Sequence, residues 1–225
     1  MFTSKILAAA LLACGLASMA TSAQASLITF TGGTVTRNDA STGVTNNAIN
    51  WDGVQSYEEA GFRFTFIGTD SDFSSNVGDF YEVGNDVLQG HWATGNFGYL
   101  TQIRLTRTDG GTFSLGGFDI VSNTDTGGGP ASGNEQVYVH ASADGSTDDF
   151  AQLLPSKDSD FPAIGFALGS PFSNVRAIWF DVTGASDSFG IDNLSASANS
   201  VPEPGSLALL GAGAFGLWAT RRRKR

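Results

Sequence analysis

Apolar residues in the middle of the chain recur at every second position, and this spacing restricts the fold more than any other feature. In "FRFTF" the aromatic residues Phe62, Phe64 and Phe66 fall on one face of an extended segment. Similar runs follow, including "TFSLGGFDIV", "NEQVYVHAS" and "NVRAIWFDV", and turn signals such as "TDGG" and "ADGS" separate them. The pattern has no long amphipathic helix and no fixed repeat, and it predicts an all-β fold: about eight to ten short strands in an antiparallel, jelly-roll-like β-sandwich.

Residues 1–25 have the three zones of a secretory signal peptide. Lys5 supplies the positive charge, "ILAAALLACGLA" is the apolar region, and Ala23 and Ala25 form a small-x-small cleavage site. A lipoprotein signal with Cys14 as the lipidated residue is the alternative, which the large Leu12 disfavours. We expect the exported chain to begin at Ser26, after cleavage by the secretion machinery. Without Cys14 it has no thiol, which excludes disulfides and cysteine chemistry.

The last 25 residues, 201–225, form a second membrane-directed segment. Val201, Pro202, Glu203 and Pro204 precede an apolar run, 207–220, that five basic residues follow: Arg221, Arg222, Arg223, Lys224 and Arg225. As a helix this run is about 21 Å long, which is short against about 30 Å of hydrocarbon. The basic end predicts a stop-transfer signal that stays in the cytoplasm. A buried core helix is the alternative, but its glycines and its unpaired cations disfavour it.

The tail resembles the PEP-CTERM sorting signal of Gram-negative bacteria, in which the motif, the apolar run and the basic end occur in this order. The resemblance implies that an exosortase in the inner membrane processes the tail and passes the body to the cell surface, the outer membrane or the extracellular matrix. It further implies a host that makes exopolysaccharide or biofilm. The same tail is also described as an ice-binding protein C-terminal domain. Ice binding ranks last, because "TVT" and "LTRT" are isolated threonine runs rather than a regular array.

The body between the two segments, residues 26–200, is strongly acidic. Removing Lys5 and the five basic residues of the tail leaves six cationic side chains, and removing Glu203 leaves 21 acidic ones, so the formal charge is −15. Such a surface repels nucleic acid and anionic lipid. It suits divalent cations, although a solvated acidic surface is the more ordinary interpretation.

Three stretches, "VYVHASADGSTDDFAQL", "AIWFDVTG" and "FGIDNLSAS", resemble the second half of galactose-binding-like and lectin-like jelly rolls. In calcium-containing members an acid in the last strand holds a structural ion. The resemblance therefore implies Asp192 and Asn193 as possible calcium ligands, and no other cofactor is expected. Thr31 stands where the usual first-strand acid is sought, which weakens the match.

Trp51 and Trp92 lie in polar, glycine-rich segments, unlike Trp179 in "AIWF". Exposed indoles stack on the apolar faces of sugars, and His91 beside Trp92 can hydrogen-bond to hydroxyls. The two rings and His91 are therefore candidate sugar contacts, although folding back of the rings over the end of the sandwich is the more ordinary interpretation.

No catalytic motif is present in the body, and no catalytic residues are predicted. His91 and His140 have no metal spacing and are expected to be surface imidazoles. A pair of carboxylates for glycoside hydrolysis is possible in any sandwich, but the sequence selects none. We expect a non-enzymatic component of the exopolysaccharide or biofilm matrix, structural or adhesive. A carbohydrate-binding module is the alternative, and a glycan-processing enzyme ranks below it.

Overall fold

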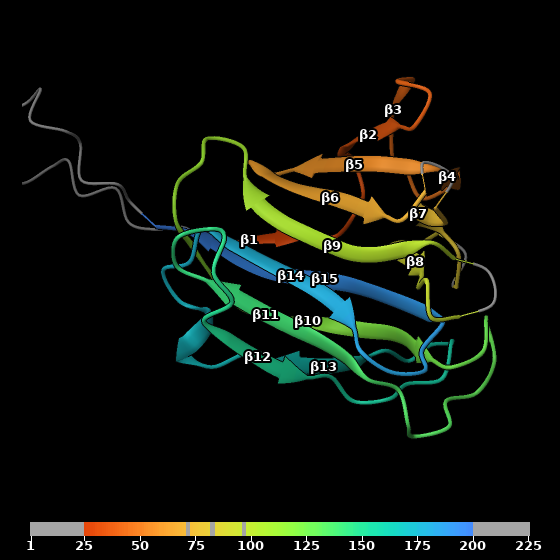
Figure 1. Cartoon of the computed structure of the whole chain (residues 1–225). Helices are drawn as coiled ribbons and strands as arrows, with labels where there is room; N and C mark the ends of the chain where they lie inside the picture. The colour runs from red at the N-terminus through yellow and green to blue at the C-terminus, as the bar shows by residue number, and fades with distance from the viewer. Residues whose placement is uncertain (1–24, 71–72, 82–83, 96–97, 200–225) are drawn as a thin grey trace, which may run out of the picture. The chain divides into compact units, whose positions relative to one another are not determined.

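The alternating run "FRFTF" forms strand β6 (Phe62–Gly68), and its side chains Phe62, Phe64 and Phe66 are buried as the spacing predicts. The computed structural model describes residues 25–199 except 71–72, 82–83 and 96–97, and these residues form two antiparallel sheets packed as two layers (Figure 1). The predicted antiparallel β-sandwich is confirmed. The signal helix and the apolar helix 207–220 lie outside the described residues.

One layer is a seven-stranded sheet in the order β13-β10-β15-β8-β7-β4, with β1 also paired to β15. Its strands are β1 (Ala25–Ile28), β4 (Trp51–Asp52), β7 (Ser75–Asp79), β8 (Asp86–His91), β10 (Phe113–Thr124), β13 (Ile164–Ala167) and β15 (Ser188–Ala198). The long strands β10 and β15 pair along most of their length, with three register shifts. They form the centre of this layer, between the edge strand β13 and strands β8 and β1.

The other layer is an eight-stranded sheet in the order β12-β11-β14-β9-β6-β5-β2-β3. Its remaining strands are β2 (Thr34–Arg37), β3 (Thr42–Val44), β5 (Val54–Glu59), β9 (Leu100–Arg107), β11 (Val137–Ser142), β12 (Phe150–Leu153) and β14 (Ala177–Val182). From β8 to β11 the chain changes sheet at every step, a connection mode found in jelly rolls. The single helical turn among the described residues is the 3-10 segment η1 (Ser170–Phe172). No helix of this part of the chain has the length and apolarity to span a bilayer.

The core lies between the sheets and is rich in aromatic residues. Phe118 packs edge-on against Phe180, with ring centroids 5.3 Å apart, and Phe180 packs against Phe189 at 5.4 Å. These contacts join β10, β14 and β15 across the two layers. Burial of such large apolar side chains is the main stabilising contribution, because this body contains no disulfide.

The structure contains strands that the alternation does not predict, and the clearest are β7 and β8. Every residue of "SNVG" and "DVLQG" is buried, so one face of these strands carries polar side chains that are nevertheless hidden from solvent. Asn76 and Gln89, for example, form a 2.8 Å hydrogen bond on this face. A strand buried on both faces loses the simple inside-outside alternation that sequence reading relies on.

The "ADGS" signal does join two paired strands, β11 and β12, but through a loop of residues 143–149 rather than a two-residue turn. The Asp144 carboxylate organises this loop by accepting hydrogen bonds from the backbone N–H groups of Ser146 (2.7 Å) and Thr147 (2.8 Å). These hydrogen bonds lower the pKa of Asp144 far below its usual value.

Candidate functional site

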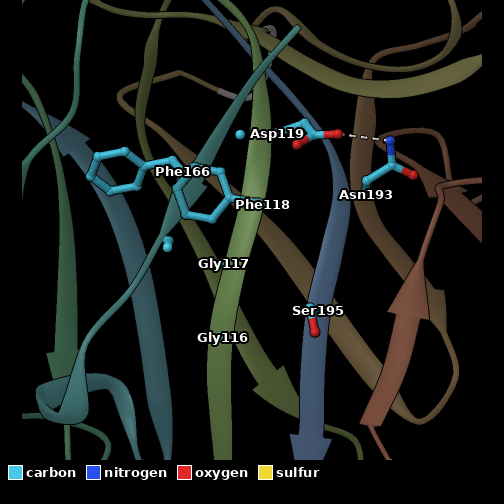
Figure 2. Close-up of a pocket in the computed structure, with 9 residues that line it drawn as sticks. Gly116, Gly117, Phe118, Asp119, Phe166, Asn193 and Ser195 are labelled. Carbon is cyan, nitrogen blue, oxygen red and sulfur yellow. Dashed lines mark hydrogen bonds between the residues drawn. The ribbon is translucent and has the colours of Figure 1, made fainter.

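An open groove of about 360 Å³ lies where β13, β10 and β15 run side by side in the seven-stranded sheet (Figure 2). Its lining comprises Gly116, Gly117, Phe118 and Asp119 of β10, Gly165, Phe166 and Ala167 of β13, and Asn193 and Ser195 of β15. The volume falls in the range of about 300–1,000 Å³ that is usual for small-molecule sites. Because the groove is open, a ligand longer than the cavity can lie along it.

The groove is open because glycines stand where side chains would otherwise fill it. A Cβ added at Gly116 would meet nothing closer than Ser195 at 3.7 Å, and a Cβ at Gly165 would meet Asp119 Oδ1 at 3.5 Å. Both distances are ordinary van der Waals contacts, and neither glycine has a positive φ. The other glycines within described strands, positions 43, 68, 78, 90, 117 and 190, either have a positive φ or would bring an added Cβ within 3.2 Å of a neighbouring atom. Backbone conformation or a close neighbour therefore favours glycine at those positions, and neither reason applies at Gly165 or at Gly116, which lies at a register shift of β10 against β15.

Polar groups form one side of the groove. Asn193 has a φ of 48°, in the left-handed region, and this conformation turns its side chain toward two carboxylates. Its Nδ2 donates to Asp119 Oδ2 at 2.9 Å, as Figure 2 shows, and to Asp192 Oδ2 at 3.2 Å. Its backbone N–H donates to Asp192 Oδ1 at 2.7 Å. Asn193 thus holds Asp119 at the rim of the groove, where Asp119 Oδ1 faces Gly165.

Asp192 itself lies beneath the rim, with 1% of its surface exposed. Besides the two bonds from Asn193, it accepts a hydrogen bond from Asn85 Nδ2 at 3.1 Å. Burial raises the pKa of Asp192, hydrogen bonds from Asn85 and Asn193 oppose this, and the negative charges of Asp119 and Glu59 raise the pKa further. The predicted pair Asp192 and Asn193 is therefore brought into one cluster, and Asn193 reaches the groove.

The structure gives this cluster hydrogen-bond donors rather than further metal ligands. Among the described residues, no three histidine, cysteine or acidic side chains come together in a way that could hold a metal ion. Thr31 donates to Asn47 Oδ1 at 2.7 Å, in a different set of contacts from those of Asp192. Calcium binding by Asp192 and Asn193 remains a prediction.

Asp86 belongs to the contacts around Thr31 and is a buried acid that sequence reading missed. It exchanges two hydrogen bonds with Asn47: Asn47 N–H donates to Asp86 Oδ2 at 2.8 Å, and Asp86 N–H donates to Asn47 Oδ1 at 2.9 Å. Asp86 Oδ1 is buried and has no partner among the described residues. Burial raises the pKa of Asp86, hydrogen bonds from Asn47 and Thr31 oppose the rise, and the charge of Asp79 adds to it.

The two loop tryptophans do not form one surface. Trp92 is 0% exposed and packs against Phe189, with ring centroids 5.7 Å apart, so it takes the packing role and offers no exposed ring face. Trp51 lies in β4 at the edge of the sheet, half-buried, with its ring over Gly43. Trp51 is the one of the two that could still contact a sugar.

His91 is half-buried and lies between two polar partners. Its Nδ1 is 3.1 Å from Asp187 Oδ1, and its Nε2 is 3.0 Å from Gln89 Nε2. Asp187 is fully buried, and its backbone oxygen accepts a hydrogen bond from the Trp92 N–H at 2.8 Å. His91 and Trp92 are therefore brought together, within a buried polar arrangement next to β8.

The prediction of a surface imidazole is wrong for His140, which is 8% exposed. Its ring stacks on Trp179, with centroids 5.2 Å apart and an interplanar angle of 5°, and Arg104 lies over the Trp179 ring at 5.4 Å. Nδ1 of His140 is 2.9 Å from Asp148 and Nε2 is 2.9 Å from Asp181. Burial alone lowers the pKa of His140, but the hydrogen bonds and charges of Asp181 and Asp148 outweigh burial and raise the pKa.

The residues predicted to direct export lie largely outside the described part of the chain. These are the sorting motif 201–204, the basic residues 221–225 and Ala23 of the cleavage site. Ala25, the other cleavage residue, is the first residue of β1 and lies opposite Ser197 of β15.

No protein with a curated description matches this chain. Among solved structures, the fold is similar to that of a DUF4465 family protein from Bacteroides caccae, with 12% sequence identity and a TM-score of 0.37. That match covers 70% of this chain and 90% of the other. Residues 200–224 match the PEP-CTERM protein-sorting motif, which confirms the resemblance seen in the sequence and implies an exported protein that is sorted by an exosortase.

Proposed function

We propose that the chain is a non-catalytic protein of the cell surface or extracellular matrix, with a structural or adhesive role in exopolysaccharide or biofilm. The observation that carries this proposal is the PEP-CTERM motif at 200–224, which directly follows a β-sandwich body. The exosortase and the secretion translocon are then its processing partners, and the inner membrane is a transient location. The body is what remains outside to act in the matrix.

The charge of the body supports a place in a hydrated matrix. With a formal charge of −15, the exported domain repels other copies and other polyanions and stays soluble without a partner protein. The same charge disfavours nucleic acid as a ligand.

The groove supports a role without catalysis. Hydrolysis of a glycosidic bond ordinarily needs two carboxyl groups facing the substrate, separated by about 5–9.5 Å. Asp119 is the single acid among the residues that line the groove. Its neighbour Asp192 is buried and has both oxygens engaged by Asn85 and Asn193.

The proposal is tested in the native host by fractionation of cells that express the tagged wild-type protein or a variant lacking residues 200–225. We expect the wild type in the polysaccharide matrix or on the cell surface, and the truncated variant in neither. A host without the gene should form a matrix that is weaker or holds fewer cells. Recovery of the wild type only from the cytoplasm or the inner membrane would contradict the proposal.

A further inference from the structure

We propose that the groove over Gly116 and Gly165 binds a segment of a glycan chain that carries no acidic groups. This inference rests on the proposed function, since it names the matrix component that the exported body contacts.

The first argument is the choice of glycine. Glycine weakens a β-strand because it loses more conformational freedom than other residues and packs no side chain. Neither Gly116 nor Gly165 has a positive φ, and the 3.7 Å and 3.5 Å distances from an added Cβ to its nearest neighbours leave room for a side chain. Gly116 lies at the register shift of β10 against β15, whereas Gly165 pairs with Asp119 in regular register. Both positions line the same groove. A glycine inside a strand marks a bulge or a place where a ligand comes close to the backbone, and at Gly165, where the register is regular, close approach of a ligand is the reason we infer.

The second argument is the hydrogen-bonding capacity of the rim. Asp119 uses Oδ2 to accept from Asn193, and Oδ1 makes no hydrogen bond within the described residues and faces the groove. The side-chain oxygen of Asn193 and the hydroxyl of Ser195 are likewise without hydrogen bonds to the described part of the chain, and both residues are exposed. Three such oxygens beside an open backbone floor match the many hydroxyl donors of a sugar.

The third argument selects the charge of the ligand. A carboxylate at the rim and a body with a formal charge of −15 repel uronic acids, sulfates and phosphates. No cationic side chain is among the described residues that line the groove, so nothing there offsets this repulsion. The groove therefore favours a neutral glycan segment, or one that carries amino groups.

The test uses the processed protein isolated from the host, with Gly116→Val as the variant that fills the groove. Gly116 does not have a positive φ, and an added Cβ at this position has room. Gly169→Val is the matched control: Gly169 likewise does not have a positive φ (−92°), its added Cβ would lie 3.6 Å from Pro171, and it does not line the groove. The probes are neutral, amino-bearing and uronic-acid oligosaccharides, together with polysaccharide extracted from the host matrix.

We expect the wild type and Gly169→Val to bind neutral or amino-bearing probes and the extracted polysaccharide with the same Kd. Gly116→Val should keep its Tm and weaken binding by about tenfold or more, and Asp119→Asn, which retains an acceptor for Asn193, should weaken it about three- to tenfold. If Gly116→Val fails to fold, the Kd of Asp119→Asn relative to that of the wild type tests the inference by itself. Equal Kd values for the wild type and the groove variants, or preference for uronic acids, would overturn the inference.

The two proposals fail in different ways. If the wild type and Gly116→Val both accumulate in the matrix and bind its polysaccharide with equal affinity, the groove does not bind the glycan, but the proposed matrix role is not contradicted. If the wild-type protein never reaches the matrix, the proposed matrix role is wrong, whichever glycan the protein binds in solution.

Discussion

Replacing Trp92 by alanine separates a packing role from a sugar-binding role. The ring is fully buried and lies against Phe189, although its sequence context, "QGHWATG", is that of an exposed loop. If the ring packs, Trp92→Ala should destabilise the fold. If it were an exposed platform, the same change should instead weaken sugar binding and leave stability almost unaffected.

The magnitude follows from the surroundings of the ring. Truncating a buried tryptophan to alanine ordinarily costs about 3–5 kcal/mol of unfolding free energy. The indole Nε1 of Trp92 has no acceptor among the described residues, so truncation also relieves a buried donor whose cost is about 1–3 kcal/mol. We therefore expect a loss near the lower end, about 3 kcal/mol. For a domain of this size that lowers Tm by about 6–12 °C.

Urea unfolding followed by far-UV circular dichroism measures this loss without relying on the fluorescence of the missing residue. Trp92→Phe keeps an aromatic ring beside Phe189 and removes the unpartnered N–H, so it should cost less than about 1.5 kcal/mol. Trp51→Ala, at a half-buried edge position, should cost less than Trp92→Ala. A Trp92→Ala variant as stable as the wild type would refute the packing assignment.

Three further outcomes are expected. Burial raises the pKa of Asp86 in the folded state above its pKa in the unfolded chain. The contribution of Asp86 to stability therefore falls as pH rises from the unfolded-state pKa through the folded-state pKa. Asp86→Asn should raise Tm at neutral pH, and this gain should vanish at acid pH. A raised pKa in a base such as His140 stabilises the folded protein. This stabilisation is complete below the unfolded-state pKa, about 6.5, and is lost as pH rises through the folded-state pKa. The wild type should therefore have a higher Tm than His140→Phe at low pH, and the difference should shrink as pH rises. If Asp192 and Asn193 bind calcium, the protein should melt at a higher temperature in calcium than in chelator. Identical melting curves would show that no stabilising calcium ion is bound.

The sequence predicts the sandwich because its strands show either the alternation of one buried face, as in β6, or a continuous apolar run, as in β14, where residues 177–180 are all buried. Phe62, Phe64 and Phe66 indicate β6, and the runs around Phe118 and Phe180 indicate β10 and β14. Strands β7 and β8 go undetected because Asn76 and Gln89 are polar yet buried. These two side chains hydrogen-bond to each other across adjacent strands, a pairing that the hydrophobic period of the sequence does not reveal.

The groove is harder to predict for a related reason. The run "TFSLGGFDIV" predicts a strand, and Gly116 and Gly117 do lie inside the long strand β10, but the sequence does not show that an open groove lies over them. Whether a side chain would fit at Gly116 depends on Ser195, a residue far away in the chain. The jelly-roll resemblance points to Asn193 as a calcium ligand, and the structure shows that its side chain holds Asp119 at the rim. Trp92 looks open to solvent in the sequence because local polarity does not report the position of Phe189.

The central claim, that this is an exported protein released by processing of its tail, is tested most directly by the intact mass of the form isolated from outside the host cell. The signal-peptide pattern predicts a chain that lacks residues 1–25, and the motif at 200–224 predicts that it also lacks the apolar and basic segments 207–225. The same measurement on a variant with Arg221, Arg222, Arg223, Lys224 and Arg225 replaced by neutral residues should find no processed form outside the cell. An extracellular wild-type protein whose mass still includes the "RRRKR" end would contradict the account, because the tail would then be a permanent part of the mature chain.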